Sequence, residues 1–415
     1  MENFEKIQNG KLKLLLKEIP NHPYYKQLFL KNNIKLSSIN TVKDLAKIPF
    51  TTKEDLVKQP ERFVLNGKGD KYKPIHVHFT AGRTSRPVPF YYTKMDIETM
   101  KEVGKRLFSL VKASKNEIAV NSFPYAPHLA FWQTYYALNA CGIMSLHSGG
   151  GKILGTDKII QSIKGMNASV LLGMPGYVYH LLRTANENGV KLDSLKMLVL
   201  GGEKISDGLR NKLKTFVDAK VYSTYGFTEG KTVWGQCHED SGYHLYPDLE
   251  YVEEVDGEIV YSALDWKGSI VLRYKTGDLA KLETDKCKYC GSENPRISRD
   301  IGRKSEVREI NLVKVKGTFI NLNFVKEIVD GVKGVREWQI ELKKKNDDPY
   351  EIDEIYLYVV PVKKGDFARL KEELKKTMAQ TEISFTDIIE VSLPDMVKRL
   401  GIETELKERR ILDIR

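Results

Sequence analysis

Between residues 116 and 230, short apolar runs alternate with longer segments that have the spacing of amphipathic helices. This alternation predicts a largely parallel β-sheet whose two faces are covered by helices. In such a sheet, ligands bind beyond the carboxyl ends of the strands. The runs expected to form the strands are residues 118–120, 143–146, 169–172, 197–200 and 221–222.

The last of these runs leads into the sequence Tyr-Gly-Phe-Thr-Glu at residues 225–229. The strand is expected to end at Gly226 and to deliver the hydroxyl group of Thr228 beside the carboxylate of Glu229. Oxygen ligands on a rigid element suit the phosphates of a nucleotide and a magnesium ion. A buried strand followed by a polar turn has the same sequence pattern, so other motifs must decide between the two interpretations.

A hydroxyl-rich loop follows an earlier predicted strand. Apolar residues alternate with His76 and His78 over residues 75–79, which predicts a strand with one buried face. The loop over residues 80–87 contains hydroxyl groups, a glycine and two arginines, which together can bind phosphate oxygens. Such loops are usually only solvated, and the two histidines are expected to be strand residues and not ligands.

Two further stretches place polar residues after predicted strands. Glycines and Glu203 over residues 201–203 follow one parallel strand and are expected to face the same pocket as residues 225–229. Antiparallel strands are expected at residues 258–261 and 269–274, with a turn after the second that presents Asp278. This carboxylate can accept hydrogen bonds from both hydroxyls of a ribose, although an aspartate often simply fills a turn position.

Two other segments are less informative about function. The first seventy residues have mostly helical spacing, with a helix-start signal in Thr52 and Asp55. The glycine-rich run at residues 148–152 lacks the spacing of a P-loop, and Ile153 stands where serine or threonine should be. We expect this run to be a flexible loop beside the site.

Three of the four cysteines predict a metal site. Cys287 and Cys290 form a CxxC turn followed by glycine, and Cys237 lies 50 residues before that turn. With His238 or His244, they offer the four ligands of a tetrahedral structural Zn²⁺, and His244 is preferred because it lies on a strand-like segment. A redox pair or a chance CxxC is the alternative.

The chain after residue 302 is expected to form a second domain. A polar junction at residues 301–306 contains a glycine and precedes about 115 residues with a charged surface, which is typical of a mobile lid. Strands and helices then follow in a βαββαβ-like order. They are expected at residues 313–315, 324–329, 335–342, 352–360, 367–378 and 389–391. The basic end of the chain, residues 405–415, has a solvated terminus as its simplest interpretation.

The predicted fold class is therefore α/β. A large amino-terminal domain, residues 1–302, would contain the parallel-sheet αβ layers plus a smaller β region. A small, mobile α+β domain would follow over residues 303–415. The sequence leaves the oligomeric state open, with a homodimer as one candidate.

Charge and hydropathy exclude two classes of partner. The net charge of +11 comes from 66 basic residues that are spread along the chain and interleaved with 55 acidic ones. The sequence has no localised stretch of basic and aromatic residues of the kind that binds nucleic acid. The excess positive charge instead suits small polyanions such as ATP or coenzyme A. The sequence contains no run of 18 apolar residues, so no membrane span is predicted. The few cysteines and the polar first residues predict a cytoplasmic protein.

Taken together, the ordered motifs resemble those of the acyl-adenylate-forming enzymes, and within them the phenylacetate-coenzyme A ligase family. The resemblance covers essentially the full chain and preserves the order and approximate spacing of the motifs. Residues 23–56 are similar to the amino-terminal signature of that family. The motifs that carry the resemblance are residues 80–87, 201–203, 225–229, Tyr274 with residues 276–278, 302–303, 316–317 and the tail at Lys407.

The resemblance implies that the chain binds ATP with Mg²⁺ and coenzyme A. Tyr225 would stack on adenine, Asp278 would bind the ribose, and Arg303 would lie just before the hinge. Lys316 and Gly317 would reach the active site during thioester formation. The residues that match cofactor-binding motifs are Thr80, Gly82, Thr84, Gly201, Gly202, Glu203, Tyr225, Gly226, Asp278, Arg303, Lys316 and Gly317.

Four residues match catalytic positions of the family. Thr228 and Arg86 would contact phosphate groups, Glu229 would hold Mg²⁺, and Lys407 would contact the carboxylate and the α-phosphate during adenylation. Arg86 stands where the family has a lysine, and Leu406 stands where a glycine usually precedes the tail lysine. Arginine keeps the charge of lysine but not its point-like geometry, which bears on how the triphosphate is held.

The implied reaction is ATP-dependent activation of a small-molecule carboxylic acid to an acyl-AMP, followed by transfer to coenzyme A. Alternatives are transfer to an amine, a hydroxyl or a carrier-protein thiol, and a nucleotide-binding protein without ligase activity. The resemblance favours an aromatic acid, and Tyr125, His128, Trp132 and Tyr222 are candidates for its pocket, although aromatic residues at helical spacing are more often core. Some members of the family carry a cysteine and histidine zinc site, which supports the metal prediction.

Overall fold

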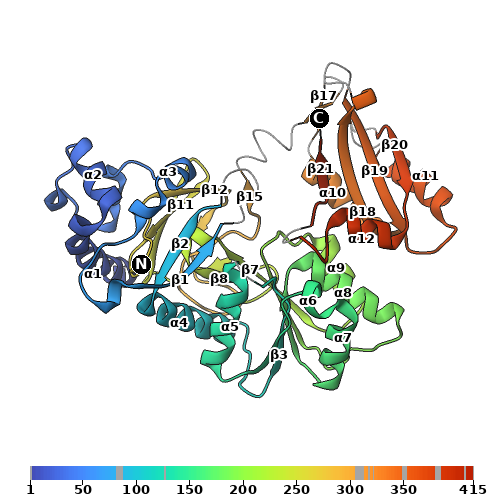
Figure 1. Cartoon of the computed structure of the whole chain (residues 1–415), viewed down its shortest axis with the longest axis horizontal. Coiled ribbons are helices and arrows are strands. Elements are labelled where there is room, and N and C mark those ends of the chain that lie inside the picture. Colours follow the sequence, from blue (N-terminus) through green and yellow to red (C-terminus); the bar gives the residue numbers. More distant parts are fainter. Residues whose placement is uncertain are drawn as a thin grey trace.

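The computed structural model of the chain describes residues 2–80, 87–125, 128–303, 313–315, 318–320, 322–347, 353–378, 385–405 and 408–414. Figure 1 shows the elements after residue 303, in orange and red, gathered into one lobe beside the green helices. We call this the small lobe, and the part of the structure before it the large lobe. No helix in the described ranges is both long and apolar enough to cross a membrane.

A sheet of nine strands, in the order β13-β14-β9-β8-β7-β6-β5-β3-β4, forms the centre of the large lobe. Five of its strands run parallel to one another, which confirms the prediction from the alternating apolar runs. These five are β3 (Ile118–Asn121), β4 (Met144–His147), β5 (Val170–Gly173), β6 (Met197–Gly201) and β7 (Lys220–Gly226). Because they are parallel, their carboxyl ends lie on the same side of the lobe.

Helices pack on the parallel strands. Every residue of β5 and β6 is buried, as expected for apolar runs covered on both faces. The core around these strands also includes Val360 and Leu400 of the small lobe, so the two lobes share apolar contacts. The helices in this part of the chain are α4 (Lys94–Leu110), α5 (Leu129–Cys141), α6 (Gly151–Leu154), α7 (Thr156–Gly165), α8 (Pro175–Glu187) and α9 (Asp207–Lys214), of which α5 packs on β3 and β4, and α8 on β5.

The other half of the nine-stranded sheet is antiparallel. After β7 and the turn η6 (Thr228–Gly230), the chain returns as β8 (Val233–Gly235), which pairs with β7. The remaining strands are β9 (Tyr243–His244), β13 (Leu282–Glu283) and β14 (Arg296–Ile297). Because β9 pairs with β14, segments near residues 240 and 290 become neighbours.

A second, four-stranded sheet contains one corrected prediction. Its strands are β10 (Glu250–Val255), β11 (Glu258–Ala263), β12 (Tyr274–Leu279) and β15 (Gly302–Arg303). The strand expected at residues 269–274 is wrong, because β12 starts at Tyr274 and Asp278 lies within it, not in a following turn. Gly277 adopts φ +77°, and the pairing of β11 with β12 is irregular, so a distortion inside the strand takes the place of the expected turn.

The hairpin that flanks the hydroxyl-rich loop consists of β1 (Pro74–Phe79) and β2 (Pro89–Thr93). Its buried face is the histidine face and not the aliphatic one. His78 is 2% exposed and packs edge-on against Tyr92, whereas Ile75 and Val77 are 52% and 41% exposed. The alternation correctly predicted a strand, but its packing partners decided which face is buried.

The segments before β1 are helical, as predicted. Thr52 and Asp55 form a capping box in which the Thr52 backbone N–H donates to Asp55 Oδ2 at 2.8 Å. Their elements are α1 (Glu2–Glu18), η1 (Ile19–Asn21), α2 (Pro23–Lys31), η2 (Leu36–Ser38), η3 (Val42–Lys47), α3 (Lys53–Lys58), η4 (Pro60–Phe63) and η5 (Asp70–Tyr72).

The small lobe has a four-stranded sheet with the order β20-β19-β18-β21. The predicted first strand, β16, instead pairs with β17 in a separate hairpin, and the edge strand β21 and the helix α12 were not predicted. The elements are β16 (Val313–Val315), β17 (Thr318–Ile320), α10 (Leu322–Gly331), β18 (Val335–Lys344), η8 (Lys345–Asp347), β19 (Asp353–Pro361), α11 (Phe367–Met378), β20 (Asp387–Glu390), α12 (Leu393–Leu400) and β21 (Ile411–Asp413).

Candidate active site

The Tyr-Gly-Phe-Thr-Glu motif occupies the end of β7 and the start of η6. Glu229 Oε1 accepts a hydrogen bond from the hydroxyl group of Tyr274 at 3.0 Å. Burial raises the pKa of Glu229, because few water molecules solvate its charged form, and the Tyr274 hydrogen bond opposes this effect. A cation that binds beside a carboxylate in this setting stabilises its charged form.

Asp278 is the point at which three motifs meet. The side chain is 3% exposed, and its Oδ2 accepts a hydrogen bond from the Tyr225 hydroxyl at 2.5 Å. Its Oδ1 accepts a hydrogen bond from Arg303 Nε at 3.0 Å. The structure therefore brings together the end of β7, the distorted strand β12 and the last residue of the large lobe before the junction.

The glycines at the end of β6 are required by close approaches. A Cβ atom on Gly201 would lie 2.2 Å from Thr224 Oγ1, so a side chain there would clash with β7. Gly202 has φ +85°, and a Cβ atom on it would lie 2.6 Å from Met174 Sδ. Gly226 is also constrained, since a Cβ atom there would lie 2.8 Å from the Thr232 carbonyl oxygen.

A cavity of about 410 Å³ lies where the ends of the parallel strands meet the small lobe. Its walls come from loops after β3, β4, β5 and β6, and from residues 402–405 and 408. Glu203 and residues 149–152 are among them, so the glycine-rich run that follows β4 does lie beside this cavity. The expectation that the whole run is a loop is wrong, because Gly151 and Lys152 begin the helix α6.

The residues proposed for an acid pocket divide into two groups. Tyr125 and His128 line the cavity. Trp132 is not part of its wall, but its ring packs 5.8 Å from that of Tyr125. Tyr222 is 7% exposed and belongs to the core of the large sheet. Sequence patterns alone did not separate wall residues from core residues.

The cavity also contains a glutamate that the sequence did not single out. Burial raises the pKa of Glu408 to about 7, with Glu203 and Glu337 adding to the rise and Arg410 opposing it. Arg410 Nε donates a hydrogen bond to Glu408 Oε2 at 2.5 Å. A Cβ atom on Gly176, the second residue of α8, would lie only 1.4 Å from Glu408 Oε1, so any side chain there would displace this carboxylate from its present position.

Several predicted site residues lie outside the described residues: Gly82, Thr84, Arg86, Lys316, Gly317 and Lys407. Thr80, at the start of the hydroxyl-rich loop, is 7% exposed, and its Oγ1 accepts a hydrogen bond from the Val88 backbone N–H at 3.0 Å. The roles of all these residues stay predictions.

A cluster of four possible metal ligands lies in the antiparallel half of the large sheet. One ligand atom from each of Cys237, His244, Cys287 and Cys290 lies within 4.8 Å of every other. The sulfur atoms of Cys237 and Cys287 are 3.6 Å apart, and His244 Nε2 lies 3.4 Å from Cys237 Sγ. Tetrahedral Zn²⁺ sites have edges of about 3.5–3.8 Å, given bonds of about 2.0–2.3 Å, so the cluster fits this ion. His238 instead stacks on Tyr289, with ring centroids 4.1 Å apart.

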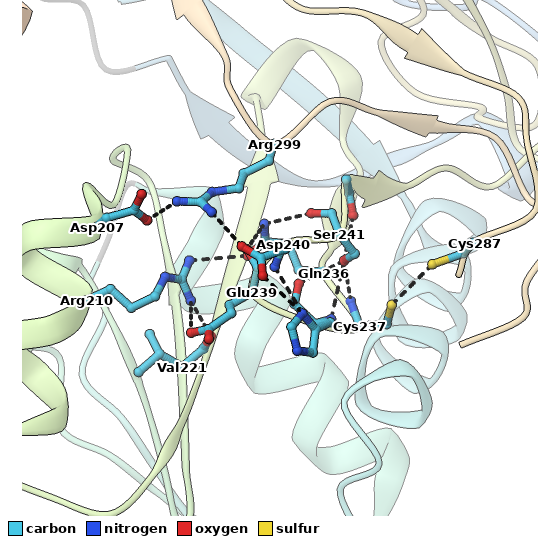
Figure 2. A network of polar contacts seen from close by, with 12 residues as sticks. Asp207, Arg210, Val221, Gln236, Cys237, Glu239, Asp240, Ser241, Cys287 and Arg299 are labelled. Atoms are coloured by element: carbon cyan, nitrogen blue, oxygen red, sulfur yellow. Dashed lines mark hydrogen bonds and ion pairs between the residues drawn. The ribbon is translucent and has the colours of Figure 1, made fainter. Parts of the chain in front are cut away.

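The loop that carries Cys237 is tied to β7 and to the segment before the junction (Figure 2). Gln236 Oε1 accepts a hydrogen bond from the Ser223 backbone N–H at 3.1 Å, and Gln236 Nε2 donates to the Ser241 carbonyl at 2.9 Å. Arg299 pairs with Asp240 at 2.8 Å and also with Asp207 of α9. The cluster of cysteines and histidine is therefore connected to the strand that ends in the Tyr-Gly-Phe-Thr-Glu motif.

Comparisons with known proteins agree with this arrangement. A family model described as AMP-binding enzyme matches residues 25–254. The chain is 26% identical, over 335 residues, to the phenylacetate-coenzyme A ligase of Thermus thermophilus, covering 76% of this chain and 74% of that protein.

Solved structures with the same fold include 2-hydroxyisobutyryl-CoA ligase. Its postadenylation state with 2-HIB-AMP has a TM-score of 0.83 at 18% identity, covering 99% of this chain and 90% of that one. Its thioesterification state with 2-HIB-AMP and CoA has a TM-score of 0.68 at 20% identity, covering 99% of this chain and 89% of that one. The overall arrangement of the present chain is thus more similar to the first of these two states.

Proposed function

The chain belongs to the family of AMP-binding enzymes, and from this premise we propose that it activates a carboxylic acid with ATP and transfers the acyl group to coenzyme A. The observation that carries this proposal is the meeting of three separate motifs at Asp278, where Tyr225 and Arg303 both donate hydrogen bonds to its carboxylate. Glu229 lies close by through Tyr274, the first residue of the strand that contains Asp278. A ribose-binding carboxylate beside a phosphate and metal site is the chemistry that ATP requires.

In the first half-reaction, the substrate carboxylate attacks the α-phosphorus of ATP and pyrophosphate leaves. Asp278 would orient the ribose, and Thr228 would bind a phosphate oxygen. Glu229 and Thr228 have the oxygen donors that Mg²⁺ prefers, and the bound ion would offset charge on the phosphates. Lys407 and Arg86 are proposed to stabilise the negative charge that develops on the α-phosphate.

In the second half-reaction, the thiol of coenzyme A attacks the acyl carbon of the acyl-AMP and AMP leaves. We place the boundary between the two domains at residues 302 and 303, with the carboxyl-terminal domain turning about the junction near residue 304. This turn would withdraw Lys407 and bring Lys316 and Gly317 to the site. The higher TM-score with the postadenylation state supports an arrangement before such a turn.

The acid is proposed to be aromatic. Tyr125 and His128 line the cavity at the strand ends, and Trp132 packs against Tyr125. The match to a phenylacetate-coenzyme A ligase supports the same substrate class. We further propose that Cys237, His244, Cys287 and Cys290 hold a structural Zn²⁺, supported by the short distances between their ligand atoms.

The decisive experiment is acid-dependent ATP–pyrophosphate exchange over a panel of aromatic and aliphatic acids. We expect exchange with at least one aromatic acid, and we expect Glu229→Ala to lower it by about 100-fold because a metal ligand is lost. Glu239→Ala is the matched control, since Glu239 forms a partly exposed ion pair with Lys214. No exchange with any acid would overturn the proposal.

Product analysis separates the proposed acceptor from its alternatives. Mass spectrometry should find AMP and the coenzyme A ester in equal amounts when coenzyme A is supplied. Acyl-AMP formed without the ester would favour an amine, a hydroxyl or a carrier-protein thiol as acceptor. Nucleotide binding without AMP release would favour a binding protein.

A further inference from the structure

A lysine side chain is buried directly after the Thr228–Gly230 turn. Lys231 is 1% exposed, and its Nζ lies 3.4 Å from Asp96 Oδ2, a carboxylate whose side chain is completely buried. The rings of Tyr92 and Trp266 cover the ammonium group, with centroids 4.9 and 5.6 Å from Nζ. Taking an ammonium ion out of water is costly, and an anion with two aromatic faces offsets that cost.

The backbone around Lys231 holds the turn that contains Thr228 and Glu229. The Lys231 backbone N–H donates to the Thr228 carbonyl at 3.3 Å, which closes the turn. Gln133 Nε2 donates to the Lys231 carbonyl at 3.0 Å, and the Tyr261 hydroxyl donates to the Gly230 carbonyl at 2.9 Å. Lys231 itself has φ +58°, a left-handed conformation that is uncommon for a residue other than glycine.

The hairpin β1–β2 covers the other side of the buried Lys231 ammonium group. Tyr92 lies in β2, pairs with His76 across the hairpin and packs against the ring of His78, with centroids 4.9 Å apart. This hairpin flanks the hydroxyl-rich loop at residues 80–87. The Tyr92 hydroxyl also lies 3.5 Å from the Thr228 carbonyl oxygen. Tyr92 is therefore in contact with both the turn and the strand that leads to the loop.

Asp96 is itself held in place from several directions. Its Oδ2 accepts hydrogen bonds from the backbone N–H groups of Thr93 at 2.7 Å and Gly268 at 2.8 Å. Its Oδ1 accepts a hydrogen bond from the Lys267 backbone N–H at 2.7 Å. Because Thr93 ends β2, the carboxylate that attracts Lys231 is fixed to the same hairpin. The ion pair between Lys231 and Asp96 thus joins the turn at Thr228–Gly230 to the hairpin β1–β2.

From this geometry we infer that Lys231 is a positioning residue for MgATP. Its ammonium group holds the turn that carries Thr228 and Glu229 in register with the hairpin that carries the hydroxyl-rich loop. The inference rests on the proposed function, in which that loop and that turn grip the same triphosphate. An apolar side chain would fill the space without the cost of burying a charge, so the paired charge indicates orientation and not merely packing.

The test compares the unmodified chain with Lys231→Met, whose unbranched side chain is one atom shorter and has no charge. Titration calorimetry would measure the affinity for MgATP without acid, and initial rates would give KM for MgATP, for the acid and for coenzyme A. We expect Lys231→Met to weaken MgATP binding by about tenfold, as for the loss of an outer-shell support of a metal ligand. KM for the acid should stay within about twofold.

Lys267→Met is the matched control. Lys267 is a partly buried lysine that pairs with Glu18 at 3.0 Å, and only its backbone contacts Asp96. The affinity of the Lys267→Met variant for MgATP should equal that of the unmodified chain. If Lys231→Met fails to fold, Trp266→Phe replaces it, because it keeps the ion pair and reduces the aromatic cover; we expect a loss of about threefold in MgATP affinity.

Unchanged MgATP binding in a folded Lys231→Met, or in Trp266→Phe where that variant replaces it, would overturn the inference. Equal changes in KM for MgATP, the acid and coenzyme A would also overturn it, because they would indicate general loosening. The calorimetric measurement needs no turnover. A chain that binds MgATP but catalyses no exchange would therefore sink the proposed function while the role of Lys231 is still measured.

Discussion

Glu229, Asp278 and Lys231 are charged side chains placed in or near the core, where each needs a partner. The structure provides those partners from distant segments: Tyr274 for Glu229, Tyr225 and Arg303 for Asp278, and Asp96 for Lys231. Each pair joins residues at least 25 positions apart, so loss of one side chain would disturb two segments at once. This density of buried charge is typical of functional sites.

A buried glutamate outside the site provides a test by pH. Burial raises the pKa of Glu250 to about 8, with hydrogen bonds from the Tyr246 backbone N–H and from Trp234 Nε1 opposing the rise. Its pKa in the unfolded chain is near 4.3, so the folded state holds a proton that the unfolded state has lost across pH 5 to 8. The free energy of unfolding should therefore fall as pH rises through this window, by up to roughly 1.4 kcal/mol per pH unit from this group.

Glu250→Gln removes this titration while keeping the shape of the side chain. Urea unfolding at several pH values should show that the free energy of unfolding of the variant depends less on pH than that of the unmodified chain. Glu254→Gln, at an exposed position near the end of the same strand, should keep the slope of the unmodified chain. Parallel slopes for Glu250→Gln and the unmodified chain would contradict the prediction.

At the scale of elements, short antiparallel strands assemble the cluster of cysteines and histidine. Cys237 follows β8, His244 lies in β9, and the two remaining cysteines lie between β13 and β14. Pairing of β9 with β14 brings these segments together, but each strand has only two residues. Such short strands contribute few hydrogen bonds, so a metal ion is expected to supply much of the local stability.

Replacing each of the two candidate histidines, His244 and His238, is expected to have opposite effects on the zinc content of the protein. His244→Ala should lose most of the bound zinc and lower the melting temperature, because one of four ligands is removed. His238→Ala should keep one zinc ion per chain, since this imidazole stacks on Tyr289. Elemental analysis of both purified proteins measures the difference. Equal zinc content in the two variants would rule out His244 as a ligand.

At the scale of the whole molecule, buried ion pairs join the two lobes. Arg183 of α8 pairs with Glu337 of β18 at 2.7 Å, and Arg410 contacts the other oxygen of Glu337 at 2.5 Å. The Glu337 side chain is completely buried between these two arginines. Nearby, Thr156 Oγ1 donates a hydrogen bond to Glu403 Oε1 at 2.8 Å. These contacts hold the small lobe over the cavity at the strand ends.

Removing one arginine should release this arrangement. Arg183→Met leaves Glu337 with Arg410 alone, and breaking a buried pair costs about 3–5 kcal/mol. We expect small-angle X-ray scattering to give a larger radius of gyration for the variant than for the unmodified chain. Lys371→Met, which loses an exposed ion pair within the small lobe, is the control. A scattering curve for Arg183→Met identical to that of the unmodified chain would show that other contacts hold the lobes.

The sequence by itself determined the parallel half of the large sheet, because apolar runs covered on both faces have few alternatives to a buried strand. It also placed Gly202 and Glu229 after strands, and it identified all four members of the cysteine and histidine cluster. These predictions depend on local periodicity and on spacing along the chain, which the sequence states directly.

Tertiary structure alone decided the rest. The buried face of β1, the position of Asp278 inside β12 and the burial of Tyr222 depend on which segments pack against these residues. Lys231 and Glu337 are ordinary charged residues in the sequence, and they become buried ion pairs only when Asp96 and Arg183 arrive from other elements. The physical reason is that burial and pairing belong to contacts between distant segments, and local sequence patterns do not encode those contacts.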